Sequence, residues 1–195
     1  MLDDRVRAVL ARLEEEDDAE QEEGLPAAQR ALPVGPESGR LLFALVAPNA
    51  GCEVLEIGGS RGYSAIWLAS AARILGGRVV SLEQDPAKIE AWHANIAEAG
   101  LEEWAELVEG NARETLPAVG GSFDVVFIDA WKDDYEWYFG EARTKVEPGG
   151  VIVADNVKTN AVVKEYAKAR QADPTLVSVT LPIGNGLEVT TVLGP

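Results

Sequence analysis

Short apolar runs alternate with stretches of helical spacing from residue 53 onward, and this alternation is the strongest constraint on the fold. Strands that alternate with helices in this way pair in parallel, because each helix carries the chain back in a right-handed crossover. The pattern predicts an α/β domain with a single Rossmann-like, doubly wound sheet of about seven strands and helices on both faces. The predicted strands are residues 53–57, 78–82, 105–108, 123–128, 151–154, 175–181 and 187–193. The predicted helices from residue 36 onward are 36–46, 64–75, 86–99, 112–116, 135–145 and 160–171.

The two ends of the chain depart from this alternation. Gly184-Asn185-Gly186 separates the last two predicted strands and is typical of a hairpin, so we expect the final strand to run antiparallel to its neighbour. Near the N-terminus, residues 2–13 have the apolar spacing of an amphipathic helix. An acidic run at 14–23 follows, which is more typical of a solvated helix end or a linker than of a binding site. We divide the chain into an N-terminal helix, acidic run and loop (1–35) and a main domain (36–195).

A glycine turn follows the first predicted strand, where residues 54–64 read VLEIGGSRGYS. Glycines such as Gly58 and Gly62 let a ligand approach the backbone, and the helix that follows offers free N–H groups to an anionic part of it. The spacing differs from the G-x-G-x-x-G of dinucleotide folds, and Glu56 would repel a pyrophosphate. A cofactor whose amino-acid end carries an ammonium fits better. The glycines alone are equally consistent with a plain tight turn.

The second predicted strand ends in another acid, Glu83, just before Asp85-Pro86. An acid about 20 residues beyond such a glycine turn is a common ligand of ribose hydroxyls. An acid that precedes a proline-capped helix is also ordinary capping, so Glu83 alone does not decide between these roles. Glu83 and the glycine turn together indicate a cofactor that contains adenosine.

Polar residues also follow the fourth and fifth predicted strands, as Asp129 and as Asp155-Asn156. Neighbouring strands would bring these side chains together beside the cofactor cleft. Two carboxylates and an amide oxygen suit a hard cation such as Mg²⁺ or Ca²⁺ and leave positions for water or substrate oxygens. An acid at a strand end commonly caps a helix, which is the alternative for Asp155 by itself. Lys132, close after Asp129, favours a reactive site.

Composition excludes several other chemistries. The chain of 195 residues has one cysteine, Cys52, and one histidine, His93. It therefore forms no internal disulfide and no Cys/His zinc site, and we expect a cytoplasmic location. A formal net charge of −16 argues against nucleic acid as a partner, because binding phosphates requires Lys and Arg. No apolar run approaches the roughly 20 residues of a membrane span, and the acidic start lacks the layout of a signal peptide.

These motifs together resemble the cation-dependent class I S-adenosylmethionine O-methyltransferases, the family that includes catechol and caffeoyl-coenzyme A O-methyltransferases. The resemblance rests on the glycine turn, Glu83, DAWK at 129–132, ADN at 154–156 and LPIGNG at 181–186. It implies that residues 36–195 are an S-adenosylmethionine-dependent methyltransferase domain. It also implies a small, hydroxylated, catechol-like acceptor held on a divalent cation, and a homodimer.

The resemblance further implies which residues bind the cofactor. Glu56, Gly58 and Ser64 would bind its methionine part. Glu83 would take the ribose hydroxyls, and Trp131 would pack on the adenine. The full set expected at the cofactor is Glu56, Gly58, Gly62, Ser64, Glu83, Asn111, Asp129 and Trp131.

The resemblance assigns the chemistry to the polar residues after the fourth and fifth strands. Asp129, Asp155 and Asn156 would hold the cation. Lys132 would act as the general base, which leaves an acceptor oxyanion to attack the sulfonium methyl in line. A hydroxyl bound to a cation has a lowered pKa, so this arrangement is chemically consistent.

Two departures and two alternatives accompany this interpretation. Arg61 stands where relatives often carry a small residue, and Asn111 where an acid is common beside adenine. One alternative is methylation of a hydroxylated uridine in tRNA, through a basic strip of Arg30, Arg40 and Lys158, although the net charge opposes it. The other is a cofactor-binding protein without catalysis, which would have no need of the expected cation ligands and base.

Overall fold

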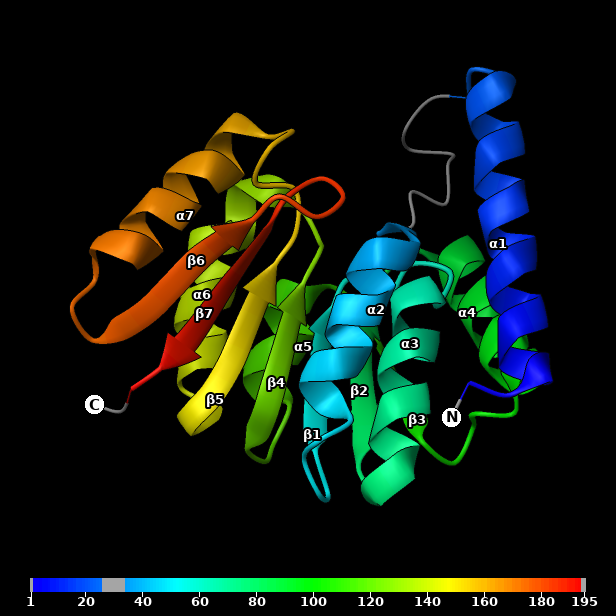
Figure 1. Cartoon of the computed structure of the whole chain (residues 1–195), viewed down its shortest axis with the longest axis horizontal. Coiled ribbons are helices and arrows are strands. Elements are labelled where there is room, and N and C mark those ends of the chain that lie inside the picture. The colour runs from blue at the N-terminus through cyan, green and yellow to red at the C-terminus, as the bar shows by residue number, and fades with distance from the viewer. Residues whose placement is uncertain (1, 26–33, 194–195) are drawn as a thin grey trace.

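The computed structural model describes residues 2–25 and 34–193, and its centre is a seven-stranded sheet (Figure 1). The strands are β1 (Glu53–Ile57), β2 (Arg78–Glu83), β3 (Ala105–Glu109), β4 (Phe123–Ile128), β5 (Val146–Ala154), β6 (Leu176–Leu181) and β7 (Leu187–Val192). Their order in the sheet is β3-β2-β1-β4-β5-β7-β6. β1 to β5 pair in parallel, whereas β7 runs antiparallel to both β5 and β6. The expected doubly wound sheet with an antiparallel C-terminal hairpin is confirmed.

Helices cover the sheet from both sides, with α2 and α3 in front and α5 and α6 behind in Figure 1. The helices are α1 (Asp4–Glu22), α2 (Gly35–Val46), α3 (Tyr63–Ala72), α4 (Pro86–Ala99), α5 (Ala112–Ala118), α6 (Tyr135–Arg143) and α7 (Ala161–Ala172). Short 3-10 turns follow α3, as η2 (Arg73–Leu75), and precede α6, as η3 (Lys132–Asp134). None of the helices in the part of the chain that the structure describes is long and apolar enough to cross a membrane.

The central strands supply side chains to two apolar cores, one on each face of the sheet. In β1, Val54 joins the core built with α1 to α4, whereas Leu55 and Ile57 join the core built with α5 to α7. Parallel strands that are covered on both faces must be apolar on both faces, which explains their continuous hydrophobic runs. Glu56 interrupts the run in β1 and is 0% exposed. A buried carboxylate in a central strand is costly, so this residue points to a function.

Two elements extend by five or more residues beyond their predicted bounds. β5 begins at Val146 rather than at residue 151. Pro148 and the glycines at 149–150 have the composition of a turn, but they lie within the strand, where the register between β4 and β5 shifts. α1 continues through the acidic run to Glu22, since glutamate is a good helix former and the first glycine is Gly24. The acidic run is therefore part of a helix.

α1 packs into the same core as the helices of the main domain. Val6, Val9, Leu10 and Leu13 are buried against α3 and α4. The division of the chain after residue 35 stays a prediction, and most of the loop expected before it, residues 26–33, lies outside the described residues.

Candidate active site

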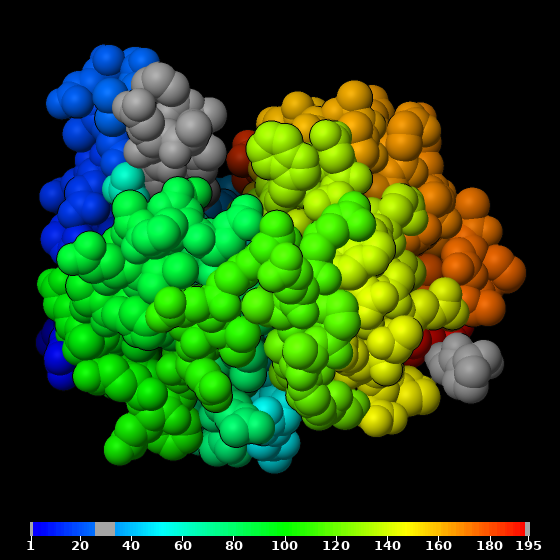
Figure 2. Space-filling view, turned by 180° about the vertical axis from the view of Figure 1, so that it is seen from behind, coloured from blue at the N-terminus to red at the C-terminus, as the bar shows by residue number. Residues whose placement is uncertain are grey.

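A pocket of about 830 Å³ lies at the carboxyl ends of β1, β2, β4 and β5. Figure 2 shows a notch in the surface beside the yellow-green segment after β4. Its size suits a cofactor together with a small acceptor. Glu56, Gly62 and Ser64 do not line the pocket and are buried beside the turn. The predicted site residues that line it are Gly58, Glu83, Asn111, Asp129, Trp131, Lys132, Asp155 and Asn156.

The glycine turn after β1 requires glycine for steric reasons. Gly58 has φ +101°, and a Cβ added there would lie 2.4 Å from the Asp129 carbonyl oxygen. Gly62 caps α3 with φ +90°, where a Cβ would lie 3.1 Å from a ring carbon of Trp92. Both positions are in the left-handed region that favours glycine. The turn is thus pressed against the first residue after β4 and against α4.

Glu83 joins the end of β2 to this turn. Its Oε2 accepts a hydrogen bond of 2.8 Å from the Ser60 N–H, and its Oε1 accepts from the Gln84 and Asp85 N–H groups at 2.8 and 3.0 Å. Three backbone donors fix the orientation of the carboxylate at the pocket wall. A carboxylate has about four acceptor positions, so Glu83 keeps capacity for a ligand hydroxyl.

Glu56 lies beneath the turn as a fully buried carboxyl group. Burial raises the pKa of Glu56 to about 7, although hydrogen bonds from the Ser64 and Ser81 hydroxyls lower it in part. The Ser81 bond is 2.6 Å long. Glu56 Oε1 has no hydrogen-bond partner. The group therefore favours a nearby cation, such as an ammonium, that would stabilise its charged form.

Asp155 and Asn156 follow β5 and present two unsatisfied oxygens. Asp155 is 1% exposed, and burial, followed by the charge of Asp129, raises its pKa. Asp155 Oδ1 and Asn156 Oδ1 are both buried without a hydrogen-bond partner, while Asn156 Nδ2 donates to Asp155 Oδ2 at 3.2 Å. Within the described residues, no group of three or more His, Cys, Asp or Glu side chains is placed to hold a metal ion. A cation here would instead use two carboxylates and an amide.

Lys132 lies in η3 beside Asp129. Its Nζ is 2.5 Å from Asp129 Oδ1 and 3.2 Å from the Tyr135 hydroxyl oxygen. The Tyr135 hydroxyl donates to the Ile128 carbonyl at 3.2 Å, and burial raises the pKa of Tyr135 well above its usual value. The tyrosine thus stays neutral and holds the ammonium from one side while Asp129 holds it from the other.

Two residues that were predicted to lie beside the adenine occupy the rim of the pocket. Trp131 is 70% exposed, which leaves its ring free to pack on a flat ligand. Asn111 caps α5, and its Oδ1 accepts from the Arg113 N–H at 2.9 Å.

The sequence-based interpretation missed pocket residues from α1. Asp17 and Gln21, in the acidic run, line the same pocket as the glycine turn. Arg61, in the glycine turn, could have indicated this contribution, because a partly buried guanidinium needs an acidic partner and the acidic run offers several. Of the basic strip considered for tRNA, Lys158 donates to the Gly184 carbonyl at 3.2 Å, and Arg30 lies outside the described residues.

The sheet is parallel with an antiparallel hairpin, and the glycine turn and the acid at the end of β2 share one pocket. These features define a Rossmann-like enzyme of the class that binds a nucleoside cofactor. Residues 55–157 match the family described as "Methyltransferase domain". The chain is 37% identical over 163 residues to a catechol O-methyltransferase of Mycobacterium tuberculosis, covering 82% of this chain and 73% of that protein. It is 39% identical over 140 residues to that of Niastella koreensis, covering 70% of this chain and 61% of that protein.

Solved structures agree with these relatives. A cofactor-bound protein from MTB has a TM-score of 0.82 and 32% identity, covering 96% of this chain and 91% of that one. An O-methyltransferase of Bacillus cereus in complex with SAH has a TM-score of 0.78 and 30% identity, covering 95% and 90%. The chain belongs to the S-adenosylmethionine-dependent class I O-methyltransferase family that contains the catechol O-methyltransferases.

Proposed function

We propose that this O-methyltransferase methylates a hydroxyl of a small, catechol-like acceptor held on a divalent cation by Asp129, Asp155 and Asn156. The observation that carries the proposal is the pair of buried oxygens, Asp155 Oδ1 and Asn156 Oδ1, that line the pocket without hydrogen-bond partners. Leaving buried polar atoms unpaired costs free energy, and a hard cation would satisfy both. The catechol O-methyltransferases that the chain resembles support the acceptor class.

The donor set fits a cation on electrostatic grounds as well. The charge of Asp129 raises the pKa of Asp155, so the two carboxylates oppose each other's ionisation. A divalent ion between them would offset this repulsion. When bound, it would lower the pKa of a coordinated phenol hydroxyl. Mg²⁺ and Ca²⁺ are the candidates, because every donor is an oxygen.

Lys132 is the proposed general base. Asp129 and Tyr135 hold its Nζ at 2.5 and 3.2 Å, on the wall of the pocket. In the reaction, the bond from the acceptor oxygen to the methyl carbon forms as the sulfonium bond to that carbon breaks. Lys132 first releases a proton to solvent. Its neutral amine then accepts the hydroxyl proton, and the products are a methyl ether and S-adenosylhomocysteine. Holding both reactants in this geometry contributes much of the rate enhancement.

The cofactor roles follow from the same pocket. We assign the ribose hydroxyls to Glu83, whose carboxylate is already oriented by three backbone donors. We assign the amino-acid end to the region of Gly58 and Glu56, because the buried carboxyl lacks a cationic partner. The exposed ring of Trp131 is assigned to the adenine.

Methyl transfer to a panel of catechols, in the presence and absence of a chelator, tests the proposal. We expect methylated catechol with Mg²⁺ or Ca²⁺, no transfer with the chelator, and recovery when the metal is added back. Binding of S-adenosylhomocysteine should persist under chelation. Turnover that the chelator leaves unchanged would rule out the cation. Methylation of undermodified tRNA without any methylated catechol would show that the acceptor is tRNA and not a catechol. The absence of transfer to either acceptor would favour a non-catalytic binding protein.

The proposal extends to a homodimer in the cytoplasm. The exposed valines Val177 and Val179 lie on the edge strand β6 and support a contact with a second copy of the chain. The chain has a single cysteine, Cys52, which is buried, and this sparse use of cysteine supports a reducing compartment. Sedimentation of the wild-type chain and of Val177→Glu should give a dimer and a monomer respectively; a monomeric wild type would contradict the dimer.

A further inference from the structure

The second half of α1 forms a wall of the pocket without apolar anchoring. The buried apolar residues of the helix end at Leu13, and Ala19 is the one apolar residue between Glu14 and Glu22. Yet Asp17 and Gln21 line the pocket. Asp17 Oδ1 is buried and has no hydrogen-bond partner. This half of α1 must therefore be held by polar contacts.

The same segment is electrostatically unfavourable as an isolated helix. The carboxyl end of a helix carries a partial negative charge, which acidic side chains oppose and basic ones offset. The last turn of α1 has no basic residue. Glu16 and Glu20 are also like charges four residues apart, which destabilises a helix. A cation supplied by another element is needed to offset this charge.

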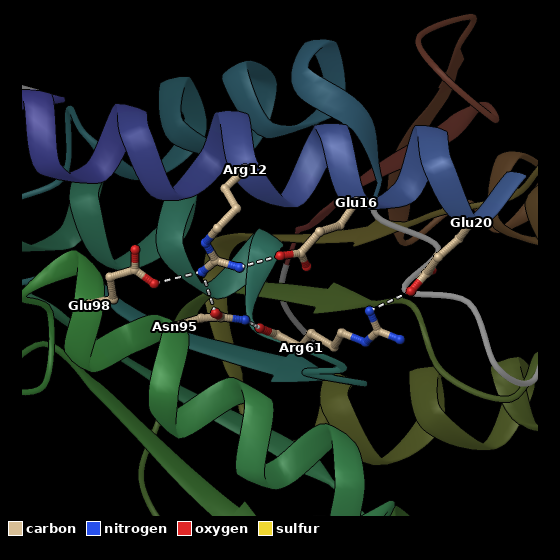
Figure 3. Close-up of polar contacts among 6 residues, drawn as sticks. All are labelled: Arg12, Glu16, Glu20, Arg61, Asn95 and Glu98. Atoms are coloured by element: carbon tan, nitrogen blue, oxygen red, sulfur yellow. Dashed lines mark hydrogen bonds and ion pairs between the residues drawn. The ribbon is translucent and has the colours of Figure 1, made fainter. Parts of the chain in front are cut away.

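Arg61 of the glycine turn supplies that cation (Figure 3). Its Nη1 lies 2.7 Å from Glu20 Oε1, and the side chains are 26% and 16% exposed, so solvent screens the pair only in part. The Arg61 carbonyl accepts from Asn95 Nδ2 at 2.7 Å, and Asn95 Oδ1 accepts from Arg12 Nη2 at 2.7 Å. Arg12 also pairs with Glu16. These contacts close a ring that attaches the turn to α1 at two points, residues 12 and 20.

We infer that Arg61 is a positioning residue, which holds the acidic second half of α1 in place as a wall of the cofactor pocket. Through it, order in α1 and retention of the cofactor are coupled. The Tyr63 hydroxyl bond to Glu14, at 2.6 Å, and the Arg12–Glu16 pair would remain. Loss of the Arg61–Glu20 pair would therefore loosen this segment towards its carboxyl end and open the pocket beside the glycine turn. The inference rests on cofactor binding in this pocket, and it leaves the acceptor and the cation aside.

Hydrogen exchange and titration with S-adenosylhomocysteine test the inference. In the wild type, we expect the ligand to slow amide exchange in residues 14–22. In Arg61→Ala and Glu20→Ala, exchange there should accelerate, and the dissociation constant should rise about five- to tenfold, as for the loss of one partly buried ion pair. The double variant should be no weaker than the worse single variant, because both changes remove the same pair. Arg61→Lys keeps the charge and should recover part of the loss.

Glu15→Ala is the matched control, since it removes an exposed acid from the same half of α1. It should leave both exchange and affinity near the wild-type values. Unchanged exchange at residues 14–22 in Glu20→Ala would overturn the inference, and so would faster exchange with unchanged affinity. Glu20→Ala also tests the pair from the helix side if Arg61→Ala fails to fold. A wild-type chain that does not bind S-adenosylhomocysteine would contradict the cofactor assignment itself, and the inference with it.

Discussion

The Ser60 N–H donates a 2.8 Å hydrogen bond to Glu83 Oε2, so the acid at the end of β2 holds the glycine turn that follows β1. The sequence pattern suggested a ribose ligand or a helix cap for Glu83. The structure shows that the same carboxylate also fixes the neighbouring backbone of the turn. One residue therefore shapes the pocket and lines it.

Glu83→Ala should weaken S-adenosylhomocysteine binding about tenfold to a hundredfold. Hydrogen bonds to a charged group contribute roughly 1.5–3 kcal/mol, and the variant loses both the ligand contact and the support of the turn. Calorimetric titration measures the change. Glu90→Ala, which removes an exposed acid of α4, is the control and should bind as the wild type does. Wild-type affinity in Glu83→Ala would show that the ribose assignment is wrong.

Asp155→Asn should reduce metal-dependent methyl transfer by at least about a hundredfold while cofactor affinity stays within about twofold. The change removes one charged oxygen donor and leaves the volume of the side chain nearly the same. Without metal, the variant should melt a few degrees higher, because a buried carboxyl beside Asp129 is replaced by a neutral amide. Turnover and thermal melting of the same preparation check both parts. Full activity in Asp155→Asn would exclude it as a cation ligand.

The buried Glu56 should make the free protein less stable as the pH rises. The pKa of its carboxyl group rises from an ordinary value of 4.5 to about 7 on folding, so the folded state binds more protons between these limits. The free energy of unfolding contributed by this group is therefore highest below pH 4.5 and falls as the pH rises to about 7. The loss amounts to roughly 3 kcal/mol. Denaturant unfolding of the wild type and Glu56→Gln across this range isolates the effect, and parallel curves would contradict it.

Gly58→Ala should destabilise the fold, whereas Gly140→Ala should stabilise it. At Gly58, with φ +101°, a Cβ would lie 2.4 Å from the Asp129 carbonyl oxygen. Backbone atoms cannot move aside cheaply, so a loss of about 2 kcal/mol or more is expected. Gly140 is in the interior of α6 with no atom near its added Cβ, where alanine gains about 0.5–1 kcal/mol. Urea unfolding of both variants makes the comparison; equal effects would refute it.

Strand and helix positions were predictable from the sequence because the central strands are apolar on both faces. β1 and β4 have the predicted bounds, as does α4, which begins after Asp85 at Pro86 and ends before Gly100. β5 was placed five residues late, since Pro148 and the glycines at 149–150 are poor strand formers when neighbours are ignored. Pairing with β4 decides that region, and pairing is not visible in local sequence.

The site was predictable to the extent that its residues end strands. Glu83 is the last residue of one parallel strand, Asp129 and Asp155 directly follow two others, and such ends meet at one edge of a sheet. For the contribution of α1, Arg61 indicated that an acidic partner was needed. Local sequence could not identify that partner, because the Arg61–Glu20 contact joins residues 41 positions apart. An acidic run has the pattern of a solvated surface whenever its basic partner lies on an element distant in sequence.

The β6–β7 hairpin turn contributes Gly184 and Asn185 to the pocket, on the side of β5 away from the glycine turn. Its backbone also pairs with the segment after β5, where the Lys158 N–H donates to the Asn185 carbonyl at 2.8 Å. Asn185 can be exchanged without touching Gly58 or Glu83. Gly184 and Gly186 cannot be exchanged so freely, because both have left-handed backbones in which a Cβ would lie 2.7 Å from Ser38 Oγ and from Lys158 Cγ respectively. The two sides of the pocket are therefore built on separate elements, and we expect changes at position 185 to alter the hairpin side while the side formed by Gly58 and Glu83 keeps its shape.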